Sequence, residues 1–177
     1  MNHVSQSQQA KTIMSDIRNE TMGDIEFIRE IHRAAFASHP HSLNSEQDIV
    51  DGLRAADALS VSLVAIDNEV VVGHIACSPI MIDVASSNWY GLGPVAVHPD
   101  LQGKGIGGAL VRASIDQLRT SGASGVVLLG EPDYYRRFGF TARSELKLPG
   151  APASHFLCLP LSAHIPSGIV NYRAAFG

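Results

Sequence analysis

Five glycines lie between Gly93 and Val111, in the stretch GPVAVHPDLQGKGIGGALV, and four of them fall within six residues. An apolar, strand-like segment precedes these four, and a helix-like segment follows them. Because glycines have no side chains, the backbone amides of such a stretch can converge on a phosphate at the positively polarised start of the helix. A simple connection gains little from four glycines, since each adds conformational entropy to the unfolded chain. The stretch therefore predicts a phosphate-binding loop.

Two common phosphate-binding motifs fit this stretch poorly. A nucleoside-triphosphate loop needs Ser or Thr after its lysine, but Gly105 follows Lys104. The dinucleotide motif G-x-G-x-x-G is matched from Gly103 to Gly108, and Glu131 stands near the place of a ribose-binding acid. However, HPDLQ separates the glycines from the strand, and the flanking chain lacks the alternating strand–helix pattern of a dinucleotide domain. A dehydrogenase that binds NADH is therefore the weakest interpretation retained.

A third motif fits better, because Gln102, Gly105 and Gly107 form Q-x-x-G-x-G at the start of the helix. This spacing resembles the acetyl-CoA signature of the GNAT N-acetyltransferase superfamily. The segment YYRRFGF, which ends at Phe140, is similar to the Tyr-x-x-x-Gly-Phe segment of the same superfamily. Both motifs lie between residues 92 and 140 and resemble a bacterial branch of these enzymes. The resemblance implies that acetyl-CoA binds the loop residues Gln102, Gly103, Lys104, Gly105, Ile106, Gly107 and Gly108.

Glycine and proline interrupt the strand before this loop, at Gly91, Gly93 and Pro94. Glycine within a strand often marks a bulge, and proline cannot donate a hydrogen bond to the ladder. The strand could therefore diverge from the later segment GVVLLG, although an ordinary edge bulge is the alternative. In the family that the chain resembles, such a gap admits the pantetheine arm of the cofactor. The resemblance implies that this arm binds the backbone of Val95, Ala96 and Val97.

Acetyl transfer to an amine requires a deprotonated amine, donors for the developing oxyanion and a proton for the departing thiolate. The resemblance implies that Tyr135 is the general acid that supplies this proton, and that Tyr134 packs beside the cofactor. The general base is not apparent. Glu131 lies either near the thioester or at the start of a short helix that it caps, and family members often use a water chain. Arg136 and Arg137 either bind CoA phosphates or face solvent.

Hydrophobic periodicity and turn residues predict the elements that position these groups. Strands are expected over 17–21, 59–67, 70–83, 88–97, 125–130, 155–161 and 167–176, and helices over 24–36, 45–56, 106–121 and near 132–138. Asp24 is placed to cap the first helix, and Ser45 with Asp48 resembles a capping box at the second. The order predicts a single α+β domain. The resemblance implies a GNAT-like fold, with a mixed central sheet splayed at the cofactor-binding strands and helices on both faces.

Composition and charge exclude several classes of protein. The chain has 177 residues, 45% hydrophobic and 17% charged, which is typical of one globular domain. We expect this domain over residues 15–177, after a flexible tail at 1–14. The net charge is −4 and no basic run occurs, so nucleic acid is not an expected partner. No apolar run reaches the ~18 residues of a membrane helix, and the first residues lack a signal-peptide core, which together favour a cytoplasmic protein.

The cysteines and histidines do not indicate a metal site. Cys77 and Cys158 each lie in an apolar run without ligand spacing, so we expect buried free thiols. His39 and His41 flank Pro40, but no third ligand lies nearby in the sequence. No metal is therefore expected.

The sequence thus predicts a cytoplasmic N-acetyltransferase that moves an acetyl group from acetyl-CoA to an amine on a small molecule or protein. Direct transfer in a ternary complex is expected, and a homodimer is compatible with this prediction. The alternative is a CoA-binding sensor or regulatory module with the same fold and little transferase activity. Residues 38–44 and 146–154 are expected to determine the acceptor, but neither segment carries a recognisable motif. Acyl-chain preference has no sequence signal.

Overall fold

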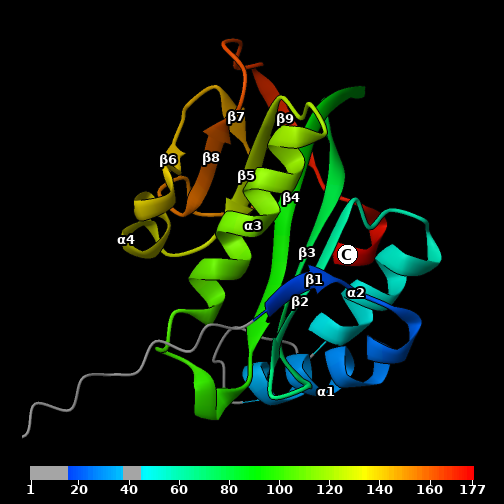
Figure 1. The fold of residues 1–177 in the computed structure, drawn as a ribbon. Helices are drawn as coiled ribbons and strands as arrows, with labels where there is room; N and C mark the ends of the chain where they lie inside the picture. Colours follow the sequence, from blue (N-terminus) through cyan, green and yellow to red (C-terminus); the bar gives the residue numbers. More distant parts are fainter. Residues whose placement is uncertain (1–15, 38–44) are drawn as a thin grey trace, which may run out of the picture.

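A mixed β-sheet forms the centre of the computed structural model, which describes residues 16–37 and 45–177 (Figure 1). The predicted tail at 1–14, and the segment 38–44 with its two histidines, lie outside the described residues. The strands are β1 Asp16–Asn19, β2 Val61–Asp67, β3 Val70–Ile82, β4 Ala85–Val97, β5 Gly125–Leu129, β6 Thr141–Ala142, β7 Leu146–Lys147, β8 Phe156–Pro160 and β9 Gly168–Asn171. The helices are α1 Ile25–Phe36, α2 Glu46–Ala55, α3 Ile106–Thr120 and α4 Pro132–Tyr135. Short 3₁₀ turns are η1 Met22–Asp24, η2 Pro99–Leu101, η3 Arg136–Phe138 and η4 Ala174–Phe176.

The strands follow the order β1-β2-β3-β4-β5-β8-β6, and β9 pairs with both β3 and β7. Strands β1 to β4 form antiparallel pairs, whereas β4 and β5 run parallel. Parallel neighbours need a crossover, and α3 supplies it between these two strands. The described chain therefore contains one β-α-β unit, formed by β4, α3 and β5, within an otherwise mainly antiparallel sheet. The glycine loop joins β4 to α3 in this unit.

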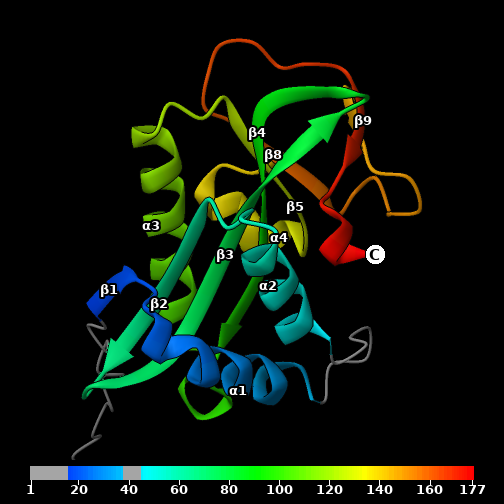
Figure 2. The ribbon, with the colours of Figure 1, turned by 90° about the vertical axis from the view of Figure 1, so that its right-hand side faces the viewer.

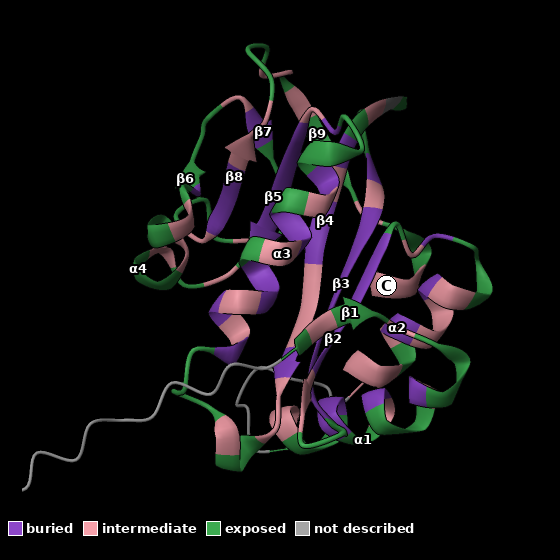
Figure 3. Cartoon of the chain, in the orientation of Figure 1, coloured by how far each residue is buried: buried purple, intermediate pink, exposed green. Residues whose placement is uncertain are grey.

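Helices cover both faces of the sheet, as predicted (Figure 2). On one face, Leu110 and Val111 of α3 pack against Ile75 of β3 in the largest apolar cluster. On the other face, Ile28 of α1 and Val50 of α2 pack in a separate cluster. Strands β2, β3 and β5 are buried along most of their length, whereas β4 is only partly buried (Figure 3). In β5, Val126 and Leu128 lie in the α3 cluster, whereas Val127 lies in a third cluster with residues of β4, β8 and β9. This burial on both faces explains why the segment that forms β5 is continuously apolar.

The structure corrects three local predictions. Asp24 stands at the predicted N-cap position of α1, but its side chain makes no capping hydrogen bond to that helix. Its carboxylate instead accepts the backbone amide of Thr21 at 2.7 Å, in a capping box that starts one turn earlier. Ser45 precedes α2, but its side chain makes no capping hydrogen bond, so the box with Asp48 does not form. The last strand ends at Asn171, and the chain then turns into η4 instead of continuing as a strand to residue 176.

Candidate active site

Positive backbone φ angles shape the glycine loop before α3. Gly103 has a φ of 74° and Gly105 a φ of 89°, which residues with a Cβ rarely adopt. Helix α3 starts at Ile106, and its first intrahelical bond runs from the amide of Ala109 to the carbonyl of Gly105, at 3.0 Å. The amides of residues 106–108 therefore have no partner within the helix. They form a group of donors at its positive end.

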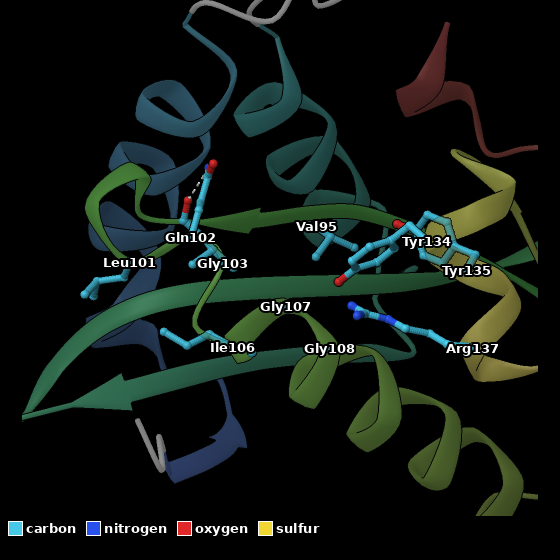
Figure 4. Close-up of a pocket in the computed structure, with 12 residues that line it drawn as sticks. Val95, Leu101, Gln102, Gly103, Ile106, Gly107, Gly108, Tyr134, Tyr135 and Arg137 are labelled. Atoms are coloured by element: carbon cyan, nitrogen blue, oxygen red, sulfur yellow. Dashed lines mark hydrogen bonds between the residues drawn. The ribbon is translucent and has the colours of Figure 1, made fainter. Parts of the chain in front are cut away.

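Two polar side chains of the loop bind the chain itself. The side-chain amide of Gln102 donates to the carbonyl of Val97 at 3.1 Å, the bond drawn in Figure 4. Lys104 Nζ donates to the carbonyl of Asp100 at 3.0 Å. These bonds tie the loop to the end of β4 and to η2. Lys104 was predicted to bind the cofactor, but it is not among the cavity-lining residues described below.

A cavity of about 470 Å³ lies between β4, the glycine loop and α4 (Figure 4). It is lined by Val95, Val97, Leu101, Gln102, Gly103, Gly105, Ile106, Gly107, Gly108, Tyr134, Tyr135 and Arg137. The predicted site is therefore brought together, apart from Lys104 and Ala96. The side chain of Ala96 is 2% exposed and packs in the cluster beneath α1, on the opposite face of the sheet. Leu101 was missed, although an apolar side chain just before a glycine loop was a usable signal.

Strands β4 and β5 diverge where the glycines and proline of β4 occur. Their ladder joins residues 89–91 to residues 125–127, and no described pair continues it. On the other side of β4, Ile75 pairs with Val95 and Cys77 with Leu92, so two residues of β4 oppose one of β3. This is a β-bulge at Gly93 and Pro94. The bulge and the divergence agree with the predicted gap, and the cavity follows the diverging end of β4.

Tyr135 is positioned by close packing at the end of the cavity. A Cβ built on Gly130 would lie 2.5 Å from the Tyr135 ring, so only glycine permits this approach. The ring also lies 4.9 Å from that of Tyr134 and 5.9 Å from that of Phe140, centroid to centroid. Burial raises the pKa of Tyr135 to about 12, and Tyr134 adds to the increase while Arg137 opposes it. The phenol is therefore protonated at neutral pH.

The two arginines of this segment point in different directions. The guanidinium of Arg137 lies 4.0 Å from the ring centroid of Tyr134 and lines the cavity (Figure 4). Arg136 instead has a 73% exposed side chain that lies 3.7 Å from Asp133. The guanidinium carbon of Arg112 in α3 lies 5.2 Å from the ring centroid of Phe138, so Arg112 also contacts an aromatic side chain of this segment.

Glu131 stands at the N-cap position of α4, but its side chain makes no capping hydrogen bond, so the interpretation of its carboxylate as the cap is wrong. Its Oε1 lies 3.6 Å from Nε2 of His155, and Ser154 Oγ lies 2.9 Å from the other ring nitrogen of that histidine. The main chain joins the same segments, because the amide of Gly130 donates to the carbonyl of His155 at 2.9 Å. No local pattern in the sequence indicates this pairing, since the residues are far apart in the chain.

The described residues contain two free cysteines but no cluster of metal-ligating side chains. Within residues 16–37 and 45–177, no cluster of three His, Cys, Asp or Glu side chains is arranged to hold a metal ion. Cys77 and Cys158 are buried and free, as expected. No helix in these ranges is long and apolar enough to span a membrane.

Comparison with known proteins identifies the family. The model of the acetyltransferase (GNAT) family matches residues 25–140, more than half of the chain. The chain belongs to the GNAT acetyltransferase family. The N-acetyltransferase YhbS of Escherichia coli K12 is 36% identical over 125 residues, which cover 70% of this chain and 72% of YhbS. The family match overturns the interpretation of the glycines as the dinucleotide motif of a dehydrogenase. The single β-α-β unit of the described residues agrees with this, because a dinucleotide domain needs a repeated strand–helix pattern.

Two solved structures resemble this GNAT chain over most of its length. One is a GNAT family acetyltransferase from Brucella melitensis in complex with acetyl-CoA, with a TM-score of 0.84 and 48% identity. The match covers 92% of this chain and 98% of that one. The other is YhbS from Escherichia coli in complex with CoA, with a TM-score of 0.84, 32% identity and coverage of 92% and 91%. The predicted GNAT-like α+β fold is therefore confirmed.

Proposed function

We propose that this GNAT protein transfers the acetyl group of acetyl-CoA directly to a primary amine of a small molecule or protein, within a ternary complex. The observation that carries this proposal is the single cavity that joins the glycine loop to Tyr135 along the diverging end of β4. Support comes from the similar Brucella melitensis and YhbS structures, which contain acetyl-CoA and CoA respectively. A homodimer and a cytoplasmic location remain predictions, as does a domain that spans residues 15–177.

The glycine loop fits the pyrophosphate of such a cosubstrate. No described atom lies within 4 Å of a Cβ built on Gly103 or Gly105, so the approach to the loop is open. At Gly107 a Cβ would lie 3.3 Å from the Tyr134 hydroxyl, and a larger side chain would enter the cavity. We assign the amides of residues 106–108 to the phosphates and the backbone of residues 95–97 to the pantetheine arm. When bound, acetyl-CoA supplies the activated acetyl thioester.

Tyr135 is the residue that we assign as the general acid. Its phenol lines the cavity and retains its proton at neutral pH because burial raises its pKa to about 12. It can donate this proton to the sulfur as the carbon–sulfur bond breaks and the new carbon–nitrogen bond is complete. The raised pKa makes the phenol a weaker acid. Because the thiolate is already a fair leaving group, we expect Tyr135 to assist rather than to dominate the reaction.

The test is thiol release from acetyl-CoA with a panel of primary amines. We expect amine-dependent turnover and a roughly ten- to hundredfold lower kcat in Tyr135→Phe, with acetyl-CoA binding retained. Tyr90→Phe is the matched control, because the Tyr90 hydroxyl lies 3.2 Å from Asn88 and outside the cavity lining. A wild-type rate in Tyr135→Phe would contradict the assignment of the acid. Binding of CoA without turnover of any amine would instead favour the CoA-binding regulatory module.

A further inference from the structure

Two arginines converge on Gly108, in the first turn of α3. A Cβ built on Gly108 would lie 3.4 Å from Arg112 Nη1, 3.4 Å from Arg137 Nη2 and 3.6 Å from Cζ of Phe138. The ring of Phe138 contacts both cations, because their guanidinium carbons lie 5.2 Å and 4.8 Å from its centroid. In Figure 4 the side chain of Arg137 extends from η3 toward the start of α3. Two cationic groups from separate elements therefore reach the same point beside the glycine loop.

Neither guanidinium has a carboxylate partner in the part of the chain that the structure describes. No carboxylate of residues 16–37 and 45–177 lies within 4.0 Å of either group, whereas the adjacent Arg136 pairs with Asp133. Both side chains are exposed, so a ligand can reach their nitrogens from solvent. Two like charges repel each other, and an anion placed between them adds two attractions that oppose this repulsion. The pair is thus arranged to receive an anion.

A phosphate monoester is the anion that matches this pair. It carries a charge close to −2 at pH 7 and three acceptor oxygens, which guanidinium groups bind through hydrogen bonds of about 2.7–2.9 Å. Two nitrogens that each lie 3.4 Å from one point are close enough for one phosphate to bridge them. In contrast, each phosphate of a pyrophosphate diester carries a single charge, and the amides of residues 106–108 are already assigned to the pyrophosphate.

The arginine pair stands at the rim of the cavity. Arg137 lines the cavity, whereas Arg112, one helical turn after Gly108, lies outside the lining. In coenzyme A the pyrophosphate joins the thioester arm to a ribose that carries a 3′-phosphate monoester. When the pyrophosphate lies on the amides of α3 and the arm follows β4, the ribose leaves the cavity on the other side of the pyrophosphate. The 3′-phosphate is therefore the monoester that reaches the rim.

We propose that Arg112 and Arg137 bind the 3′-phosphate of the cosubstrate, and that Gly108 leaves room for the two guanidiniums to approach each other. The inference rests on the proposed function, since it takes acetyl-CoA as the cosubstrate. The pair makes the protein selective for CoA over 3′-dephospho-CoA. Gly108, which lies outside the Q-x-x-G-x-G motif, thereby has a role of its own.

Titration calorimetry with CoA and 3′-dephospho-CoA tests this selectivity, because the two ligands differ only in that phosphate. We expect the wild-type protein to bind CoA about tenfold more tightly, a moderate preference because both arginines are exposed. In Arg112→Gln the preference should fall to about threefold or less, while the affinity for 3′-dephospho-CoA stays unchanged. Arg137→Lys keeps the charge but loses the planar guanidinium, and should retain part of the preference. Arg136→Gln is the matched control, because it removes the same charge from a side chain that pairs with Asp133, and should leave the preference intact.

Equal binding of the two ligands by the wild type, or an undiminished preference in Arg112→Gln, overturns the inference. An equal loss of affinity for both ligands in Arg112→Gln also refutes it, because the arginine would then bind the pyrophosphate. Raising the ionic strength from about 0.05 M to about 0.5 M should reduce the preference, since salt screens exposed charges. A preference that does not change with salt contradicts an electrostatic contact. Failure of both ligands to bind would instead overturn the proposed function.

Discussion

Lowering the pH from 7 to 5 should destabilise the fold through two buried histidines, His32 of α1 and His74 of β3. His32 Nε2 lies 2.9 Å from His74 Nδ1, and His74 Nε2 lies 2.9 Å from the hydroxyl of Ser62. That hydroxyl donates to Glu20 at 2.6 Å, and Glu20 also pairs with Arg54 at 2.9 Å. Because a carboxylate only accepts, two neutral rings satisfy every bond in this chain.

The magnitude follows from the burial of the two rings, each of which is 0% exposed. Burial lowers the pKa of His32 to about 3, with a contribution from His74, and burial also lowers the pKa of His74. A histidine in the unfolded chain has a pKa of about 6.5, so below this pH the unfolded state binds more protons. The stabilisation is present above pH 6.5 and is lost as the pH falls toward 3. Between pH 7 and 5 the loss is about 2 kcal/mol for His32, and His74 adds to it in the same direction.

Urea unfolding at pH 7, 6 and 5 measures this loss. Burial acts to raise the pKa of Glu20, but hydrogen bonds from His74, Arg54 and Ser62 outweigh burial and lower this pKa to about 2. The carboxylate of Glu20 therefore stays ionised from pH 7 to pH 5. His32→Gln keeps an N–H donor for His74 but cannot titrate, and should remove the His32 share of about 2 kcal/mol from the pH dependence. His98→Gln, at a half-exposed position, is the control. Equal free energies of unfolding at pH 7 and 5 would refute the reasoning.

Three further substitutions have defined outcomes. Gly107→Val should lower acetyl-CoA affinity at least tenfold in calorimetry, because its Cβ would lie 3.3 Å from the Tyr134 hydroxyl; unchanged affinity would place the cosubstrate elsewhere. Asp24→Ala removes the capping-box acceptor and both hydrogen bonds from Arg18, and should lower the free energy of unfolding in urea by about 1–2 kcal/mol. A decrease below a few tenths of a kcal/mol would count against a stabilising role of the capping box. Phe140→Ala leaves a cavity at a site that is 1% exposed and should lower the free energy of unfolding by about 3–5 kcal/mol. A decrease below about 1 kcal/mol would show that neighbouring core side chains move to fill the cavity.

The predictable parts of this protein obey local rules. The left-handed φ angles at Gly103 and Gly105 favour glycine, so the glycines in the sequence indicate the backbone shape of the loop. The bulge at Gly93 and Pro94 follows in the same way from residues that weaken a strand. Strands and amphipathic helices each have a characteristic spacing of apolar residues, which is why the predicted bounds of most elements lie within a few residues of the observed ones.

The unpredicted parts depend on contacts between distant segments. His32 lies in α1 and His74 in β3, and their rings are in contact only because the helix packs on the strand. The residues around each histidine do not indicate that the other will lie opposite. Glu131 and His155 come together only because β8 pairs with β5. Arg136 and Arg137 are adjacent in sequence, and which one faces the cavity depends on where the 3₁₀ turn η3 begins. Such pairings need the folded topology.

The most direct test of the central claim is the thermal stability of the protein with acetyl-CoA, CoA and NADH measured side by side. At a hundredfold excess over its dissociation constant, a ligand stabilises the folded state by about 2.7 kcal/mol. For a chain of this size, that corresponds to an increase in Tm of roughly 5–10 °C. We predict this increase for acetyl-CoA and CoA and none for NADH. An increase with NADH alone, or no increase with either CoA species, would contradict the assignment of the glycine loop.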